Sequence, residues 1–376
     1  MPAGTIVLVL IGGWLAGDHL RKVDPLRAAQ HKRLSFQSAD VGTPTGLSLD
    51  EARRANEALD RERPVRPGVR QLLHLGNSQA LAIMDRHPGD LTSPQWLQVL
   101  LGRRGSTADV RLGALPNMTT EETLISAVAA VEDRPARADA IVSAVVLEEF
   151  RGVGSRAELK ALARNARTRA AIRGLLEANP DLSAAASALS WAATDQKAPT
   201  SPNTWTSAID DAVMAVASRI PLVARRDRVR AYLVVKFLST RNRLLGISSA
   251  SARPVPDATF RTSIEMLELL LRYCRDRRVP LLLYLAPIRP LEPNPNLPRD
   301  VARFRREVPA LCARYRVTCL DYVHLLPEKM WSDYDTEDDT ATAGQRDFAH
   351  FTGAAHKVLA ESLIEHLSAL LAEERP

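Results

Sequence analysis

Short apolar segments alternate with amphipathic ones along two parts of the chain, residues 69–150 and 260–374. The apolar segments have the length and composition of buried strands: Val69–Leu75, Ala108–Leu112, Ala138–Leu147, Val279–Ala286 and Val317–Tyr322. Helical spacing predicts helices over residues 79–84, 93–101, a stretch from about 119, 262–275, 300–314 and 353–373. Thr262 with Glu265 forms a capping-box pattern, and we expect Thr352 to cap the last helix. This order predicts an α/β fold, a five-stranded parallel sheet with helices on both faces.

Two other regions lack the alternation. Residues 18–69 are polar, with Pro and Gly punctuation, and suggest a linker with one short helix around Leu49–Arg61. About a hundred residues separate the third and fourth strands, too many for a simple crossover, and their pattern is helical. We therefore expect the α/β domain to span 69–150 and 260–376, with a linker over 21–68 and a helical insertion over 151–259.

The N-terminal stretch Ala3–Gly17 is uncharged and apolar. It is shorter than the about 20 residues that span a bilayer, but it suits the apolar part of a signal peptide. We expect residues 1–20 to be a signal peptide or membrane anchor, which makes the protein exported, periplasmic or membrane-anchored. A buried N-terminal strand or helix is the alternative, and basic Arg21 and Lys22 after the stretch count against export.

The charge pattern limits the partners. A net charge of +6 and a pI near 9.4 permit attraction to anionic surfaces. No zinc-finger spacing, RNA-binding motif or lysine run occurs, so no nucleic-acid partner is expected. The basic segment Arg219–Arg243 is either a solvated helix packed on the core or a contact for anionic headgroups or polysaccharide.

The three cysteines, Cys274, Cys312 and Cys319, lack C-x-x-C spacing. They suggest buried thiols, or a single Cys312–Cys319 bridge in an oxidising compartment. No metal-binding constellation and no phosphate loop is present, so no cofactor is expected.

Two distant segments carry candidate chemistry. Ser78 follows the first strand in Leu75-Gly76-Asn77-Ser78, which places its hydroxyl at the carboxyl end of the sheet and its N–H at a helix N-terminus. Gly113 ends the second strand, so its N–H is a second candidate oxyanion donor and the Asn117 amide a third. Ordinary turn formation is the alternative for Gly113 and Asn117.

His350 is the best candidate base, because Asp347-x-x-His350 precedes the final helix and a loop there leaves the ring free to face the sheet. Asp347 would then hold the imidazole in the correct tautomer. His74, His324 and His356 are the alternatives, and a histidine inside a strand, such as His74, is usually a packed core residue.

Gly76-Asn77-Ser78-Gln79, the Gly113-x-x-x-Asn117-x-Thr119 segment and Asp347-x-x-His350 resemble blocks one, two and five of the SGNH/GDSL hydrolase superfamily. The resemblance covers about residues 69–150 and 260–374. It implies a flavodoxin-like sheet and a Ser-His-Asp ester hydrolase or O-acyltransferase. The family's third block carries Gly-x-Asn-Asp, where this chain has Leu147-Glu148-Glu149-Phe150-Arg151. Either Asn117 replaces the missing asparagine, or the oxyanion hole is weaker, or activity is lost.

Envelope-associated members that transfer acyl groups on exported polysaccharides also diverge in that block, and many have an N-terminal anchor. We therefore expect a serine esterase or O-acyltransferase acting on an acylated glycan or small ester, with a membrane-bound acyltransferase as a possible partner. The alternative is a catalytically inactive glycan-binding or assembly protein of the same fold. A flavin- or nucleotide-binding module is a third interpretation, which the lack of a phosphate-cradling first loop disfavours.

Overall fold

The computed structural model describes residues 47–58, 66, 68–83, 87, 89–132, 137–193, 248–333 and 346–372. The predicted signal or anchor, the basic segment Arg219–Arg243 and most of the predicted linker lie outside these residues. No helix among them is long and apolar enough to cross a bilayer. The chain divides into two compact units, and the one described below comprises Asp40–Thr194, Ser249–Asp335 and Gly344–Pro376.

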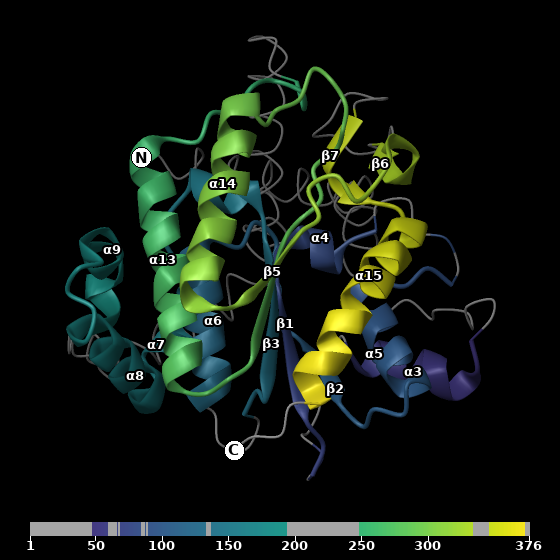
Figure 1. The fold of residues 1–376 in the computed structure, drawn as a ribbon, viewed down its shortest axis with the longest axis horizontal. Helices are drawn as coiled ribbons and strands as arrows, with labels where there is room; N and C mark the ends of the chain where they lie inside the picture. The colour runs from purple at the N-terminus through teal and green to yellow at the C-terminus, as the bar shows by residue number, and fades with distance from the viewer. Residues whose placement is uncertain are drawn as a thin grey trace, which may run out of the picture. The chain divides into compact units, whose positions relative to one another are not determined.

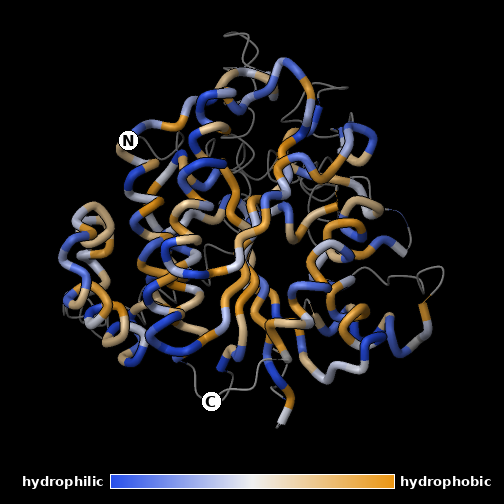
Figure 2. The backbone as a smooth tube through the Cα atoms, in the orientation of Figure 1, coloured by the Kyte–Doolittle hydropathy of each residue, from blue (hydrophilic) through white to orange (hydrophobic). Residues whose placement is uncertain are grey.

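Five parallel strands form the central sheet of this unit in the order β2-β1-β3-β4-β5. The strands are β1 (Gln71–Leu75), β2 (Asp109–Leu112), β3 (Ala140–Val145), β4 (Leu281–Leu285) and β5 (Thr318–Asp321). Every residue of β1, β3 and β4 is buried, and these strands form the apolar centre in Figure 2. A sheet covered on both faces requires such continuous apolar segments, so the α/β prediction is confirmed.

Alternate strand residues face two separate cores. Leu73 and Leu75 point to the side covered by α6 (Thr120–Glu132), α13 (Asp257–Asp276) and α14 (Pro298–Tyr315). Leu72 and Tyr284 point to the opposite side, covered by α5 (Ser93–Arg103) and α15 (Gly353–Ala372) (Figure 1). The three layers follow from the period-two alternation of side chains along each strand.

The first half of the predicted insertion packs into this unit. Helices α7 (Ala157–Ala163), α8 (Ala166–Glu177) and α9 (Ser183–Ala193) lie against α6 and α13 and bury Ile172, Leu175 and Leu189. Glu265 of α13 accepts the N–H groups of Ala184 and Ala185, which satisfies the N-terminus of α9. The compact unit therefore continues to Thr194, beyond the boundary predicted at residue 150.

The starts of two helices can be compared with the capping patterns in the sequence. Helix α13 begins at Asp257 after Pro256, and Thr262 lies inside it, with its hydroxyl donating to Ala258 O. The predicted Thr262–Glu265 capping box is therefore wrong. Helix α3 (Leu49–Glu57) has a capping box formed by Ser48 and Glu51, and it packs on α5.

A second, two-stranded antiparallel sheet was not expected. Strands β6 (Trp331–Asp333) and β7 (Arg346–Phe351) pair beyond the main sheet, with the Trp331 and Phe351 rings edge to face at 5.6 Å. Asp347 and His350 thus lie on a strand and not in the predicted loop. Strand β7 leads into α15, and Ala355 N–H donates to Thr352 Oγ1 at 3.4 Å, as predicted for the cap.

Candidate active site

Ser78 is the first residue of the short helix α4 (Ser78–Leu81), three residues after β1 ends. Asn77 caps this helix, because its side chain accepts the N–H of Gln79 at 2.9 Å. Gly76 lies in a tight space, because a Cβ there would lie 3.3 Å from the Ala144 Cβ and 3.4 Å from the Ala80 Cβ. The turn therefore presses α4 against the end of β3 and leaves Ser78 half-buried at the carboxyl end of the sheet.

The structure joins His350 and Asp347 directly. The His350 Nδ1 lies 2.8 Å from Asp347 Oδ2. A carboxylate can only accept, so Nδ1 carries the proton and Nε2 is left as the basic nitrogen. Asp347 is fully buried, and its Oδ1 accepts the backbone N–H groups of Ala349 at 2.7 Å and His350 at 3.1 Å. The carboxylate therefore fixes both the tautomer and the orientation of the ring.

Arg289 lies four residues beyond the end of β4. Its side chain holds β7, the strand that carries Asp347 and His350, in place. Its guanidinium is only 2% exposed and donates 2.7 Å bonds to the carbonyls of Asp347 and Ser332. Its other nitrogens bond Glu328 at 2.6 and 3.0 Å and Asp333 at 3.0 Å. A buried arginine needs such full pairing, and the result is a rigid link between the β4 loop and the β6–β7 sheet. Neither Arg289 nor Asp333 was identified from the sequence; an arginine just beyond a buried strand was the available signal.

The elements that carry Ser78 and His350 are neighbours. Helix α4 contacts β7, and His356 of α15 lies 3.1 Å through Nε2 from Ala82 O, just after α4. No hydrogen bond joins Ser78 Oγ to His350 among the described residues. Catalytic hydrogen bonds are often long without substrate, so the meeting of these two groups stays a prediction.

The three predicted oxyanion donors differ in whether their donor groups are already hydrogen-bonded and in where they lie. Ser78 N–H, at the first residue of α4, has no acceptor within the helix. Gly113 N–H donates to His74 O at 2.8 Å and continues the β1–β2 pairing, so it is already bonded here and its role as an oxyanion donor stays a prediction. Asn117 is exposed and adopts φ +50°, a backbone conformation that Asn tolerates well in turns.

A buried acidic residue lies after β3, in the segment where the sequence lacks the asparagine of the resembled family. Glu149 belongs to the 3₁₀ helix η2 (Leu147–Arg151) and is 5% exposed. Burial, and secondarily the charge of Glu148, raises its pKa well above the ordinary value. Its Oε1 has no hydrogen-bond partner within the described part of the chain.

The three alternatives for the base have different surroundings. His74 is fully buried, its ring 6.3 Å from that of Tyr284, and burial lowers its pKa to about 4. His356 is also buried, and its Nδ1 accepts the N–H of Ser93. His324 lies beside Arg305 on the exposed surface. None of them competes with His350 as the base.

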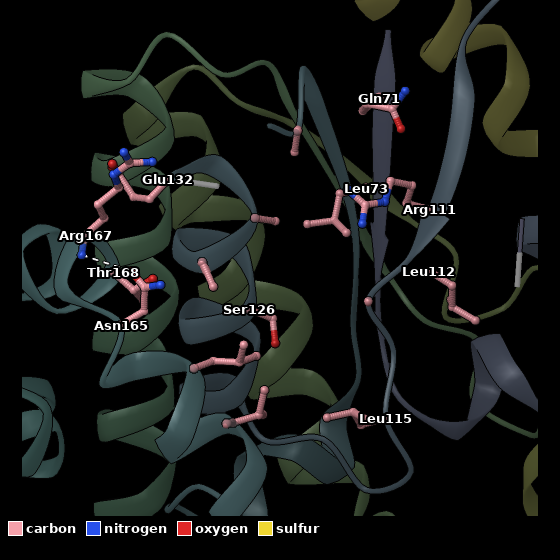
Figure 3. A pocket seen from close by; sticks show the side chains of 16 residues that line it. Gln71, Leu73, Arg111, Leu112, Leu115, Ser126, Glu132, Asn165, Arg167 and Thr168 are labelled. Atoms are coloured by element: carbon pink, nitrogen blue, oxygen red, sulfur yellow. Dashed lines mark hydrogen bonds between the residues drawn. The ribbon is translucent and has the colours of Figure 1, made fainter. Parts of the chain in front are cut away.

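A cavity of about 510 Å³ lies on the α6 side of β1 and β2. Its wall includes Leu73, Arg111, Ser126 and Asn165 (Figure 3). Gly113 and Leu115 also line it, but Ser78, His350 and Asp347 do not. We therefore place the candidate active site at the carboxyl end of the strands and not in this cavity. Among the described residues, no group of three or more His, Cys, Asp or Glu side chains could hold a metal ion.

No family model matches the chain. No curated protein matches it. Solved structures with some likeness include a proposed acylhydrolase from Bacteroides fragilis, at 9% identity and a TM-score of 0.36, covering 89% of this chain and 99% of that one. Another is the SGNH-hydrolase family esterase AlinE4, at 12% identity and a TM-score of 0.33, covering 82% of this chain and 100% of that one. At these identities and scores the likeness adds nothing to the parallel α/β fold already described.

Proposed function

We propose that this protein is a serine esterase or O-acyltransferase in which Ser78, His350 and Asp347 form the catalytic triad. The observation that carries the proposal is the pair formed by buried Asp347 and half-buried His350, with Nδ1 to Oδ2 at 2.8 Å, on a strand in contact with the helix that begins at Ser78. A buried carboxylate that orients an imidazole is the arrangement needed to activate a hydroxyl nucleophile.

In this mechanism Ser78 Oγ attacks the acyl carbonyl while His350 Nε2 takes its proton. Asp347 stabilises the imidazolium, which then returns the proton to the departing alcohol oxygen. The acyl group remains on Ser78 until water or a second hydroxyl attacks it, again with His350 as base. Water gives hydrolysis and a glycan hydroxyl gives transfer, so the acceptor alone separates the two reactions.

The proposed substrate is an O-acyl ester, most simply an acetyl ester, of a cell-envelope glycan. The apolar stretch Ala3–Gly17 and the basic segment Arg219–Arg243 support a place outside the cytoplasm, with the basic segment touching an anionic surface. A membrane-bound acyltransferase would be the fitting partner if the reaction is transfer.

Release of acetate from an acetylated sugar or from p-nitrophenyl acetate tests the proposal. We expect turnover by the wild type and loss of at least about 10³-fold in kcat for His350→Ala. His324→Ala, an exposed histidine away from the pair, is the control and should leave turnover unchanged. Equal activity of all three proteins would contradict the proposed base.

Two observations favour a second function. The Gly113 N–H is already bonded to His74 O, and no hydrogen bond joins Ser78 to His350 in the described ranges. An inactive glycan-binding protein of the same fold would show both features. Binding of an acetylated oligosaccharide without turnover, unchanged by His350→Ala, would favour this alternative.

A further inference from the structure

Helix α4, which begins at Ser78, is only four residues long. A single helical turn has almost no stability of its own, so contacts from neighbouring elements must fix its position. One contact lies near its beginning, where the Gln79 side chain donates to Pro287 O at 3.3 Å. The contact just after its end is made by the ring of His356, a residue of α15.

Two hydrogen bonds in series connect the backbone of Ser78 to the His356 ring. Ala82, the residue that follows α4, donates its N–H to Ser78 O at 2.9 Å. The carbonyl oxygen of Ala82 in turn lies 3.1 Å from His356 Nε2. A carbonyl oxygen can only accept, so Nε2 carries the proton of this imidazole. The ring is therefore joined through Ala82 to the proposed nucleophilic residue.

The other nitrogen of the His356 ring is bonded as well. With the proton on Nε2, Nδ1 is an acceptor, and it takes the N–H of Ser93 at 3.0 Å. Ser93 is the first residue of α5, and both residues are fully buried. A buried ring that is bonded through both nitrogens cannot rotate or shift without losing a hydrogen bond. The ring thus forms a fixed connection between α15, the start of α5 and the end of α4.

His356 is also fixed with respect to the candidate base. It lies in the first turn of α15, which follows β7 directly, and its backbone N–H donates to Thr352 O at 3.2 Å. Its ring lies 4.6 Å from that of Phe351, the residue after His350. Phe351 is itself fully buried, and its ring packs edge to face on Trp331. A short, tightly packed path therefore leads from β7 through His356 to α4.

We propose that His356 is a positioning residue, whose ring holds Ser78 on α4 at the correct place relative to His350 on β7. This inference rests on the proposed function and adds a residue that acts only through its neighbours. Proton transfer from Ser78 to His350 requires the two groups to come within hydrogen-bond reach, and a displacement of about 1 Å can lower a rate about 10²-fold. The bond to Ala82 acts on α4, whereas the bond to Ser93 anchors the ring to α5.

Three variants remove the hydrogen bonds of His356 selectively. His356→Phe keeps a ring but removes both bonds. His356→Asn can place an oxygen near the position of Nδ1 and keep the Ser93 bond, whereas His356→Gln can place an N–H near the position of Nε2 and keep the Ala82 bond. With p-nitrophenyl acetate, we expect His356→Phe and His356→Asn to lower kcat about 10²-fold with little change in KM. His356→Gln should lose about tenfold less than His356→Asn, because the bond to α4 remains.

Two control variants on α15 separate position from stability. Leu367 is fully buried and lies about 16 Å further along the helix axis than His356. Leu367→Ala opens a cavity there and should lower the denaturant midpoint, while turnover per folded molecule stays unchanged. His366→Gln, at an exposed position, should change neither quantity.

The outcomes distinguish this inference from the proposed function. Full kcat in folded His356→Phe, or an equal loss of kcat in Leu367→Ala, would overturn the positioning role while Ser78 chemistry stands. If His356→Phe does not fold, the other two variants decide, and a loss in His356→Gln as large as that in His356→Asn would overturn it. Failure of the wild type itself to turn over or to be labelled at Ser78 would overturn the proposed function and this inference together.

Discussion

Asp347 Oδ2 lies 2.8 Å from His350 Nδ1, and both residues sit on the strand β7 that enters helix α15. Because the same carboxylate also accepts two backbone N–H groups, its position does not depend on the imidazole. The acid can therefore select the ring tautomer in the free protein, before any substrate is present.

Replacement of Asp347 by Asn tests this role. The amide is similar in size but can present an N–H to the ring, which favours the tautomer with no free base at Nε2. We expect kcat for an ester to fall on the order of 10³- to 10⁴-fold, with the fold retained by circular dichroism. Asp333→Asn, on the neighbouring strand, is the control; wild-type turnover in Asp347→Asn would exclude the aspartate from catalysis.

Arg289 and Arg346 both pair with Asp333, but only Arg289 is buried and reaches Asp347 O. Arg289→Met leaves the buried carbonyls of Ser332 and Asp347 without their donor, and we expect a loss of about 2 to 6 kcal/mol in the free energy of unfolding. Arg346→Met removes a half-exposed pair and should cost no more than about 1 kcal/mol. Urea unfolding measures both, and equal losses would show that the buried guanidinium does not hold β7.

The buried ring of His74 should make the stability of the folded protein sensitive to acid. Its pKa falls from 6.5 to about 4 through burial, so the folded protein keeps the ring neutral where the unfolded chain already takes up a proton. Stability should therefore be complete above pH 6.5 and decrease as pH falls toward 4, by about 3 kcal/mol in total.

His74→Leu should remove this part of the pH dependence of unfolding, whereas exposed His324→Ala should keep it. Denaturant midpoints measured between pH 4 and 7 make the comparison. An identical acid decline in wild type and His74→Leu would assign the sensitivity to other groups.

Gly113 is interpreted as a packing glycine. A Cβ there would lie 2.7 Å from Leu75 Cδ2 and 3.1 Å from Leu73 Cδ1, while a Cβ at Gly152 would meet nothing within 4 Å. We expect Gly113→Ala to lower the free energy of unfolding by about 1 to 3 kcal/mol through overpacking, and Gly152→Ala to be close to neutral. Activity per folded molecule should survive in Gly113→Ala, and a selective loss of kcat would return this residue to the oxyanion hole.

The central sheet could be predicted because each of its strands is encoded by a short local segment of the sequence. Continuous apolar segments such as Val279–Ala286 reveal a buried parallel strand, and β4 occupies the centre of that segment. The β6–β7 pairing could not be predicted, since it joins three residues to a segment of weak strand pattern across a dozen intervening positions. The position of Asp347 and His350 on a strand was missed for the same reason.

In the candidate site, too, some residues could be predicted from the sequence and others could not. Ser78, Asp347 and His350 stand in short motifs, so the sequence identifies them as candidates. The positions of Gly113 and Arg289 depend on which partners the fold brings to them, namely His74 O and Asp347 O. Nothing in the local sequence around these two residues specifies those contacts.

The central claim is that Ser78 is a nucleophile activated by His350. Labelling with a fluorophosphonate probe, followed by mass spectrometry of the modified peptide, measures this directly. We predict one label per chain, located on Ser78, absent from Ser78→Ala and strongly slowed in His350→Ala. A folded wild-type protein that stays unlabelled, or a label that persists in Ser78→Ala, would contradict the account.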